Sequence, residues 1–244
     1  MMYQGFTIAF GASALAALMT TSGILAIRHF EAWAKCNITY FISFAAGVLI
    51  AVSLVHMVPK SLGMSGHAPA MLLAGYFLMY GMNRFVTAHV CDKSQSPDFA
   101  LGIIPLIGIG FHSFIDGIVY SISFNVSLAT GGLVALGMVL HEFPEGIVTY
   151  MLLIRGGFSQ AKALVLALLA AAATTPIGTL ASYPFVNSVD PSMLGSLLAL
   201  SAGALLFVGA THLLPRAEED KRRFSILALA TGVIVAVGIA LSHG

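Results

Sequence analysis

Charged residues are scarce in this sequence. They make up 9% of the chain, whereas soluble domains carry about 25%. Because 58% of the residues are also hydrophobic, a water-soluble domain is excluded and the bilayer is the expected solvent. A formal net charge of +1 argues against nucleic acid as a partner. The two cysteines, Cys36 and Cys91, are too few for a disulfide framework.

Long polar segments are also missing. Eight apolar stretches reach the length of about 20 residues that a helix needs to cross a bilayer, and no connection between them exceeds ten residues. No Gly-x-x-x-x-Gly-Lys-(Ser/Thr) loop is present, so ATP is not an expected partner. We predict an all-α integral membrane protein that forms a single transport domain, with spans at residues 5–27, 38–58, 69–90, 99–124, 130–154, 163–185, 192–214 and 224–242.

Lys and Arg residues are distributed unequally between the two sides of the predicted bundle. Nine lie in alternate connections on one side, whereas the other side has only Lys60, and Arg84 lies within the third span. Basic connections face the cytoplasm, so both termini are expected on the non-cytoplasmic side of the cell membrane. A cleavable signal peptide is the alternative for the first span, but no Lys or Arg precedes it and its apolar run is too long.

The second and seventh spans repeat a pattern. Gly47, His56 and Pro59 recur 156 residues later as Gly203, His212 and Pro215. Five spans separate the copies, so they would cross the membrane in opposite directions, which is typical of alternating-access carriers. We therefore predict inverted repeats at residues 1–90 and 161–244 around a central pair at 99–154; a chance match between two Gly/Ala/Leu-rich helices is the alternative.

Three of the ten acidic residues lie at the centres of the fourth and fifth spans. These residues are Asp116, Glu142 and Glu145. A carboxylate at the centre of a bilayer costs several kcal/mol unless it is paired, protonated or bound to a cation. No Lys or Arg lies at the same depth in the sequence. The pattern therefore predicts bound protons or a bound metal cation.

The two acidic segments resemble each other. One reads His112-Ser-Phe-Ile-Asp116-Gly and the other His141-Glu-Phe-Pro-Glu145-Gly. Histidine and carboxylate are four residues apart in both, so each pair shares a helix face. A five-residue connection makes the helices antiparallel neighbours, and the four side chains can then meet at one depth. Nitrogen and oxygen ligands favour zinc, iron(II) or manganese over copper(I).

Other histidines carry less information. His56 and His212 lie near the ends of their spans. They are candidates for a gating or access role, and the alternative is that they bond to headgroups or cap a helix. Small residues such as Gly108 and Gly132 permit close helix packing within one chain or in a homodimer.

With these motifs in hand, the chain resembles the ZIP (zinc/iron-regulated transporter-like) family over all eight spans. The segment from His112 to Gly117 is similar to the family's His-Asn-x-x-(Asp/Glu)-Gly, and that from His141 to Gly146 to its counterpart in the fifth span. The resemblance implies a three-two-three arrangement of spans, outward termini and a two-metal centre. It also implies transport of a divalent metal, zinc first, with iron(II), manganese and cadmium as alternatives, and no other cofactor.

The resemblance also implies roles for individual residues. The main metal site would comprise His112, Asp116, His141 and Glu145, while Ser113 and Glu142 would face a second site. Two departures from the family pattern bear on that second site. Ser113 replaces the usual Asn, and Thr175 stands where many members have Glu.

Two other functions are alternatives to metal transport. An intramembrane zinc metallo-hydrolase would use His-Glu-x-x-His, but here Glu145 occupies the place of the second histidine and Pro144 interrupts the segment. A proton-coupled carrier for a non-metal substrate is the other alternative. Neither explains two matched His/carboxylate pairs together with an inverted repeat, so a metal carrier, not an enzyme, is the expected function.

Overall fold

The protein was analysed as a computed structural model that describes residues 2–30, 33, 36–85, 98–126, 128–188, 190–219 and 223–241. This described part folds into eight long helical segments and no strands. Three of the segments are joined from shorter pieces. The segments are α1 (Met2–His29), α3 (Ile38–Ala51) with η1 (Val52–Met57) and α4 (Val58–Met64), α5 (Ala68–Phe85), α6 (Asp98–Val126), α7 (Leu128–Arg155), α8 (Gln160–Ala167) with η3 (Leu168–Ala172) and α9 (Thr174–Ser182), α10 (Pro191–Leu206) with η5 (Phe207–Leu213) and α11 (Leu214–Glu219), and α12 (Ser225–Leu241).

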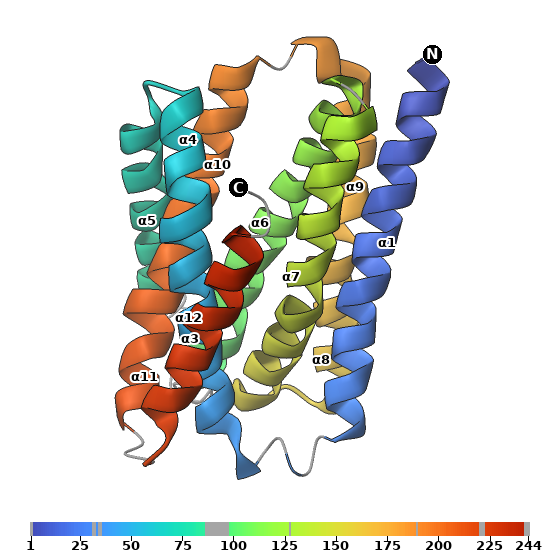
Figure 1. The fold of residues 1–244 in the computed structure, drawn as a ribbon. Helices are drawn as coiled ribbons and strands as arrows, with labels where there is room; N and C mark the ends of the chain where they lie inside the picture. The colour runs from blue at the N-terminus through green and yellow to red at the C-terminus, as the bar shows by residue number, and fades with distance from the viewer. Residues whose placement is uncertain are drawn as a thin grey trace.

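The helices run up and down in one bundle (Figure 1). Five of the described helical segments are long and apolar enough to cross a membrane, and Ser225–Gly238 is a shorter apolar helix. Each predicted span coincides with one helical segment, which confirms the eight-helix prediction. The predicted residues 86–90 and 242 lie outside the described part.

Several helices extend beyond the predicted spans. The second continues to Met64, past Pro59, and the seventh continues to Glu219, past Pro215. Proline is tolerated in the first turn of a helix because its missing N–H would have no partner there. Each proline is the second residue after a π-helical turn, η1 or η5, where a new α-helical segment begins.

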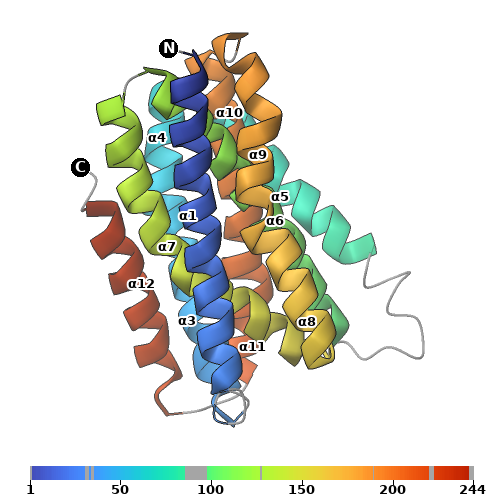
Figure 2. The same ribbon diagram turned by 90° about the vertical axis from the view of Figure 1, so that its right-hand side faces the viewer.

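Helices α1, α6, α7 and α8–α9 form one compact group, which we call the site bundle (Figure 2). Within it α1 packs on α7 and α9 packs on α6 at glycines. A methyl group at Gly23 would meet the carbonyl of Phe143, and one at Gly178 would meet that of Phe114. Backbones this close leave no space for sliding, so these pairs behave as rigid units.

Helices α3–α5 and α10–α12 form the second group, which we call the flanking bundle. Here α3 packs on α12 and α5 packs on α10, again through glycines. A methyl group at Gly47 would meet the carbonyl of Leu229, and one at Gly203 would meet that of Leu72. Gly47 and Gly203 are 156 residues apart, so these two matching positions of the predicted repeats both make a close helix contact.

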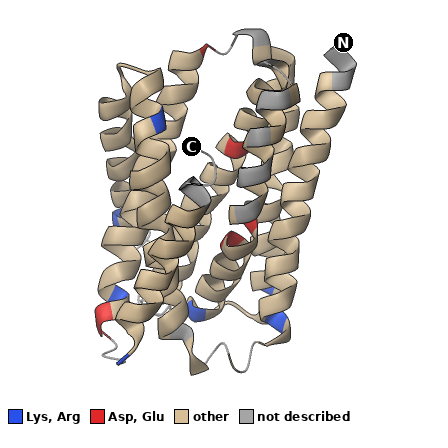
Figure 3. Ribbon diagram, viewed as in Figure 1, with Lys and Arg blue, Asp and Glu red and all other residues tan. Residues whose placement is uncertain are grey.

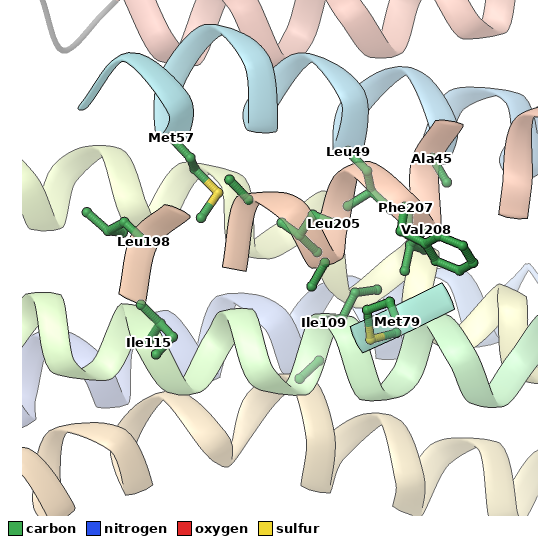
Figure 4. Close-up of a cluster of buried hydrophobic side chains, with 14 of the residues drawn as sticks. Ala45, Leu49, Met57, Met79, Ile109, Ile115, Leu198, Leu205, Phe207 and Val208 are labelled. Carbon is green, nitrogen blue, oxygen red and sulfur yellow. The ribbon is translucent and has the colours of Figure 1, made fainter. Parts of the chain in front are cut away.

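Apolar side chains fill the space between the two bundles. Figure 4 shows Ile109 and Ile115 of α6 in the same cluster as Leu49 of α3 and Leu198 and Leu205 of α10. All five side chains are buried. Side-chain contacts of this kind can be exchanged more readily than the glycine contacts within each bundle, because they do not depend on one backbone fitting against another.

Charge divides the bundle along its length. Lys and Arg gather at the lower end in Figure 3, where α1, α7 and α11 end, and each of these helices has an arginine in its last turn. Acidic residues lie midway along α6 and α7, inside the bundle (Figure 3). This is the distribution that the sequence predicts.

Candidate metal centre

Helices α6 and α7 pack against each other at the centre of the protein and carry the two His/carboxylate motifs. Each helix is continuous through its motif, and α7 continues through Pro144. His112 and Asp116 are each 4% exposed, and Glu145 is 8% exposed. The side chain of His141 is 16% exposed. The four predicted ligands are therefore largely removed from the surface.

The four side chains converge as predicted. His141 Nε2 lies 3.0 Å from Asp116 Oδ2, and His112 Nε2 lies 3.6 Å from the same oxygen. His112 Nε2 is also 3.9 Å from Glu145 Oε2. The rings of His112 and His141 are 5.7 Å apart between centroids. The two histidines and the two carboxylates thus lie close together between α6 and α7.

These separations suit a tetrahedral metal ion. Zinc binds histidine nitrogen and carboxylate oxygen at about 2.0–2.2 Å, so ligand atoms at the corners of a tetrahedron are about 3.3–3.6 Å apart. The observed separations of 3.0, 3.6 and 3.9 Å lie on either side of that range. These three pairs would need only small adjustments to hold one ion, but the four side chains do not all lie within 4.8 Å of one another, so binding by all four requires a closer approach.

A second group of possible ligands lies beside the first. Asp116, His141 and Glu142 each offer an atom within 4.8 Å of the others, as do His112, His141 and Glu145. The two groups share His141. The two groups therefore overlap and are not two separate sets of ligands.

The second-site positions are engaged in hydrogen bonds. Ser113 donates from its hydroxyl to Glu145 Oε1 at 2.6 Å. Glu142, which is fully buried, accepts from the hydroxyls of Thr20 and Thr175, the latter at 3.5 Å. The hydroxyl of Thr175, the position at which the resemblance implies a glutamate in many family members, is thus a hydrogen-bond donor to Glu142.

None of the described Lys and Arg side chains forms an ion pair with the three buried carboxylates. Lys60 of α4 interacts electrostatically with Asp116 over a longer distance. The local positive charge therefore comes from the two histidines when they are protonated, or from a bound cation.

The repeated histidines have different surroundings. His56, on η1, is half-buried and interacts electrostatically with Asp116. His212, on η5, is buried, and its Nε2 lies 3.1 Å from the carbonyl oxygen of Ala100 at the start of α6. His56 thus lies close to the candidate ligands, whereas His212 links the flanking bundle to the beginning of α6.

Sequence reasoning did not identify two residues that contact the site. Thr20 of α1 donates to Glu142, and Ser201 of α10 lies 3.3 Å from His112 Nδ1. The pair Thr20-Thr21 recurs as Thr174-Thr175 in the sixth span, so the repeat contained a signal for Thr20. Ser201 lies in a run of small residues and had no such signal.

A cavity opens beside the ligands, between the two bundles. It is lined by His112, His141 and Glu145 on one side and by apolar side chains of α3, η1 and α10 on the other. The candidate ligands therefore face a space at the junction of the bundles.

Comparison with known families agrees with this arrangement. The model of the ZIP zinc transporter family matches residues 91–240, which contain α6, α7 and all but the last four residues of the second predicted repeat. The chain belongs to the ZIP family. Its membership identifies it as a divalent metal transporter and as a multi-pass membrane protein, and it favours a transporter over the hydrolase that the sequence left open.

Individual relatives lead to the same family. The zinc transporter ZupT of Escherichia fergusonii is 30% identical over 195 residues, which cover 75% of this chain and 76% of the relative. The zinc transporter ZupT of Chlorobium chlorochromatii is 26% identical over 260 aligned positions, which cover 96% and 97%. The similarity to the Chlorobium protein thus spans nearly the full length of both chains.

Proposed function

We propose that this ZIP protein carries zinc into the cytoplasm through the site between α6 and α7. The observation that supports this most directly is the convergence of His112, Asp116, His141 and Glu145 on one buried point. Zinc is also the metal named for both relatives described above. Iron(II), manganese and cadmium accept the same ligands and are the competing substrates.

The four ligands replace the water that surrounds the ion in solution. The neutral imidazoles bind the ion through the lone pair on Nε2, and the carboxylates neutralise the two positive charges of the ion. A dication without such compensation would be strongly unfavourable at this depth. Ser113 and Glu142 complete the surroundings by hydrogen bonding, and the same pair is where any second ion would bind.

Transport then requires the site to open to one side at a time. In our proposal the site bundle moves relative to the flanking bundle, because glycine contacts make each bundle rigid and apolar side chains separate them. The predicted division into two repeats and a central pair fits this motion. Inverted repeats are related by a pseudo-two-fold axis in the membrane plane, so they can supply one arrangement that is open to the outside and one that is open to the cytoplasm. His56 and His212 lie on the flanking bundle and would contact the ion before and after release.

The membrane potential is sufficient to drive uptake. A divalent ion gains about 4.6 kcal/mol on entering a cell at −100 mV, because each charge gains about 2.3 kcal/mol. That free energy corresponds to about a thousandfold accumulation. The orientation follows from the basic end of the bundle, which we place in the cytoplasm, with both termini outside.

Uptake into proteoliposomes that contain the purified protein tests this function. Zinc, iron(II), manganese and cadmium would be compared under an imposed potential, negative inside. We expect saturable uptake with zinc preferred, and loss of uptake in Asp116→Ala and Glu145→Ala. Ser61→Ala is the control, because its hydroxyl bonds only to the Val58 carbonyl of its own helix.

Two results would contradict the proposal. Tight zinc binding without flux under any potential would exclude a carrier. Uptake that survives in both carboxylate variants would place the substrate path elsewhere in the protein.

A further inference from the structure

One candidate ligand forms a hydrogen bond with the opposite bundle. His112 belongs to α6 in the site bundle, and its Nδ1 lies 3.3 Å from Ser201 Oγ on α10 in the flanking bundle. Ser201 is fully buried and His112 is 4% exposed. The contact is therefore made away from water, where a polar group without a partner costs free energy.

Metal binding decides the direction of this hydrogen bond. If Nε2 of His112 binds the ion, that nitrogen carries no proton, and the neutral ring holds its proton on Nδ1. Nδ1–H then donates to the hydroxyl oxygen of Ser201. Histidines that bind metals commonly donate their second N–H to such a partner, which fixes the tautomer and the orientation of the ring.

The backbone on both sides of Ser201 is held firmly. A methyl group at Gly203 would meet the carbonyl of Leu72, and one at Gly75 would meet the carbonyl of Leu200. Residues 200 and 203 enclose Ser201 in the sequence, so α5 fixes this turn of α10. The hydroxyl is thus a fixed point toward which His112 can be oriented.

The other histidine has no equivalent partner in the repeat. The position 156 residues before Ser201 is Ala45, which lines the same cavity as His141. Alanine offers no hydroxyl, and Nε2 of His141 lies against Asp116 instead. Among the described residues, the hydrogen bond from the flanking bundle to a candidate histidine ligand is thus the one between Ser201 and His112.

We propose that Ser201 is a positioning residue for metal capture. Its hydroxyl accepts the Nδ1–H of His112 and thereby directs Nε2 toward Asp116 and Glu145. Because the bond joins the two bundles, it exists only while they hold their present arrangement. Ser201 thus increases metal affinity in this arrangement and is released from His112 when the bundles move. The inference rests on the proposed function, since it requires His112 to bind the ion.

Metal binding to the full-length protein in detergent tests the inference without requiring transport. Zinc affinity would be measured by competition with a chromogenic chelator in wild type, Ser201→Ala and Ser201→Thr. We expect Ser201→Ala to bind zinc about tenfold more weakly, the lower end of the loss typical for such partners. Ser201→Thr keeps the hydroxyl and should retain the affinity. In uptake assays Ser201→Ala should raise KM without lowering kcat.

Ser196→Ala is the matched control. Ser196 is also on α10, but its hydroxyl lies 2.9 Å from Ser65 Oγ within the flanking bundle. Wild-type affinity is expected for this variant. Equal weakening in Ser196→Ala and Ser201→Ala would indicate a general distortion of α10 and would overturn the inference.

A double-mutant cycle with His112→Ala separates this inference from the proposed function. Once His112 is absent, Ser201→Ala should cause no further loss of affinity. If His112→Ala binds zinc as tightly as wild type, the proposed site is wrong. If His112→Ala loses affinity while Ser201→Ala keeps it, only the role of Ser201 is overturned. The double-mutant cycle still tests the role of Ser201 if the Ser201→Thr variant fails to fold.

Discussion

Thr20 and Thr175 donate hydrogen bonds to different oxygens of the same carboxylate, that of Glu142. They come from α1 and α9, which occupy equivalent places in the two predicted repeats. Gly146 packs against the Thr20 carbonyl and Gly117 against the Thr175 carbonyl, so the two threonines also have matching backbone contacts. Glu142 is therefore held by two hydroxyls at a position that the resemblance to the ZIP family would place beside a second metal ion.

Removing one of these hydroxyls should destabilise the protein. Thr20→Val preserves the shape of the side chain but leaves a fully buried Glu142 oxygen without a donor. A lost partner of this kind costs about 1–3 kcal/mol, so the melting temperature should fall. Thr21→Val is the control, because the Thr21 hydroxyl bonds only to the Ala17 carbonyl of its own helix. Equal melting temperatures for the two variants would contradict this role for Thr20.

Introducing a carboxylate at position 175 should change the number of zinc ions bound per chain. Because the two ligand groups share His141, we expect wild type to bind one zinc per chain. Thr175→Glu adds a ligand beside Glu142 and should raise the content to two, measured by elemental analysis of the purified protein. Thr175→Gln has a similar shape without the charge and should remain at one. Two ions per chain in wild type would show that Thr175 does not block the second site.

Close backbone contact should make α1 sensitive to single methyl groups. Gly23→Ala directs a methyl at the Phe143 carbonyl and should cost about 1–3 kcal/mol, the range for overpacking. Gly11→Ala is on the same helix, where nothing lies within 4 Å, and should leave stability unchanged. Thermal unfolding in detergent measures both. A Gly23→Ala protein as stable as wild type would mean that α1 and α7 can separate at little cost.

Acid should weaken zinc uptake. Histidine ligands bind metal only when neutral and carboxylates only when ionised, so binding releases protons. Protons and the ion therefore compete for the same groups, and the affinity should fall as the pH is lowered from about 7.5 to 5.5. Proteoliposome uptake at a constant potential measures the effect as a rising KM. Uptake that does not change over this interval would show that protons do not compete with the ion.

The proximity of the four candidate ligands was predictable because each helix carries its own motif. His112 with Asp116 and His141 with Glu145 are four residues apart, and that spacing alone places each pair on one face. Thr20 and Ser201 were harder to predict because each reaches the site from a different helix. A single hydroxyl in an apolar span is common, and only the packing of α1 and α10 against the site helices gives these two a partner.

The number of helices was also predictable, since bilayer thickness sets the length of each apolar run. Their ends were not. Hydropathy decreases before Lys60 and Arg216, whereas the helices continue to Met64 and Glu219, because polar residues are as able as apolar ones to form the last turns. Which helices become neighbours was also not predictable, because the sequence shows where the glycines are but not which helix each of them contacts.

The three π-helical turns in the described part of the chain affect how these helices tolerate the insertion or loss of a residue. A π turn has the form of a single residue inserted into an α-helix, and each added residue rotates the chain beyond it by about 100° about the helix axis. In α10–α11 the turn η5 thus sets which side of the helix His212 occupies relative to Ser201. Losing one residue there would leave an apolar, membrane-length helix that turns its lower half away from α6. In this protein, chain length inside a span therefore determines the surroundings of the candidate site as much as residue identity does.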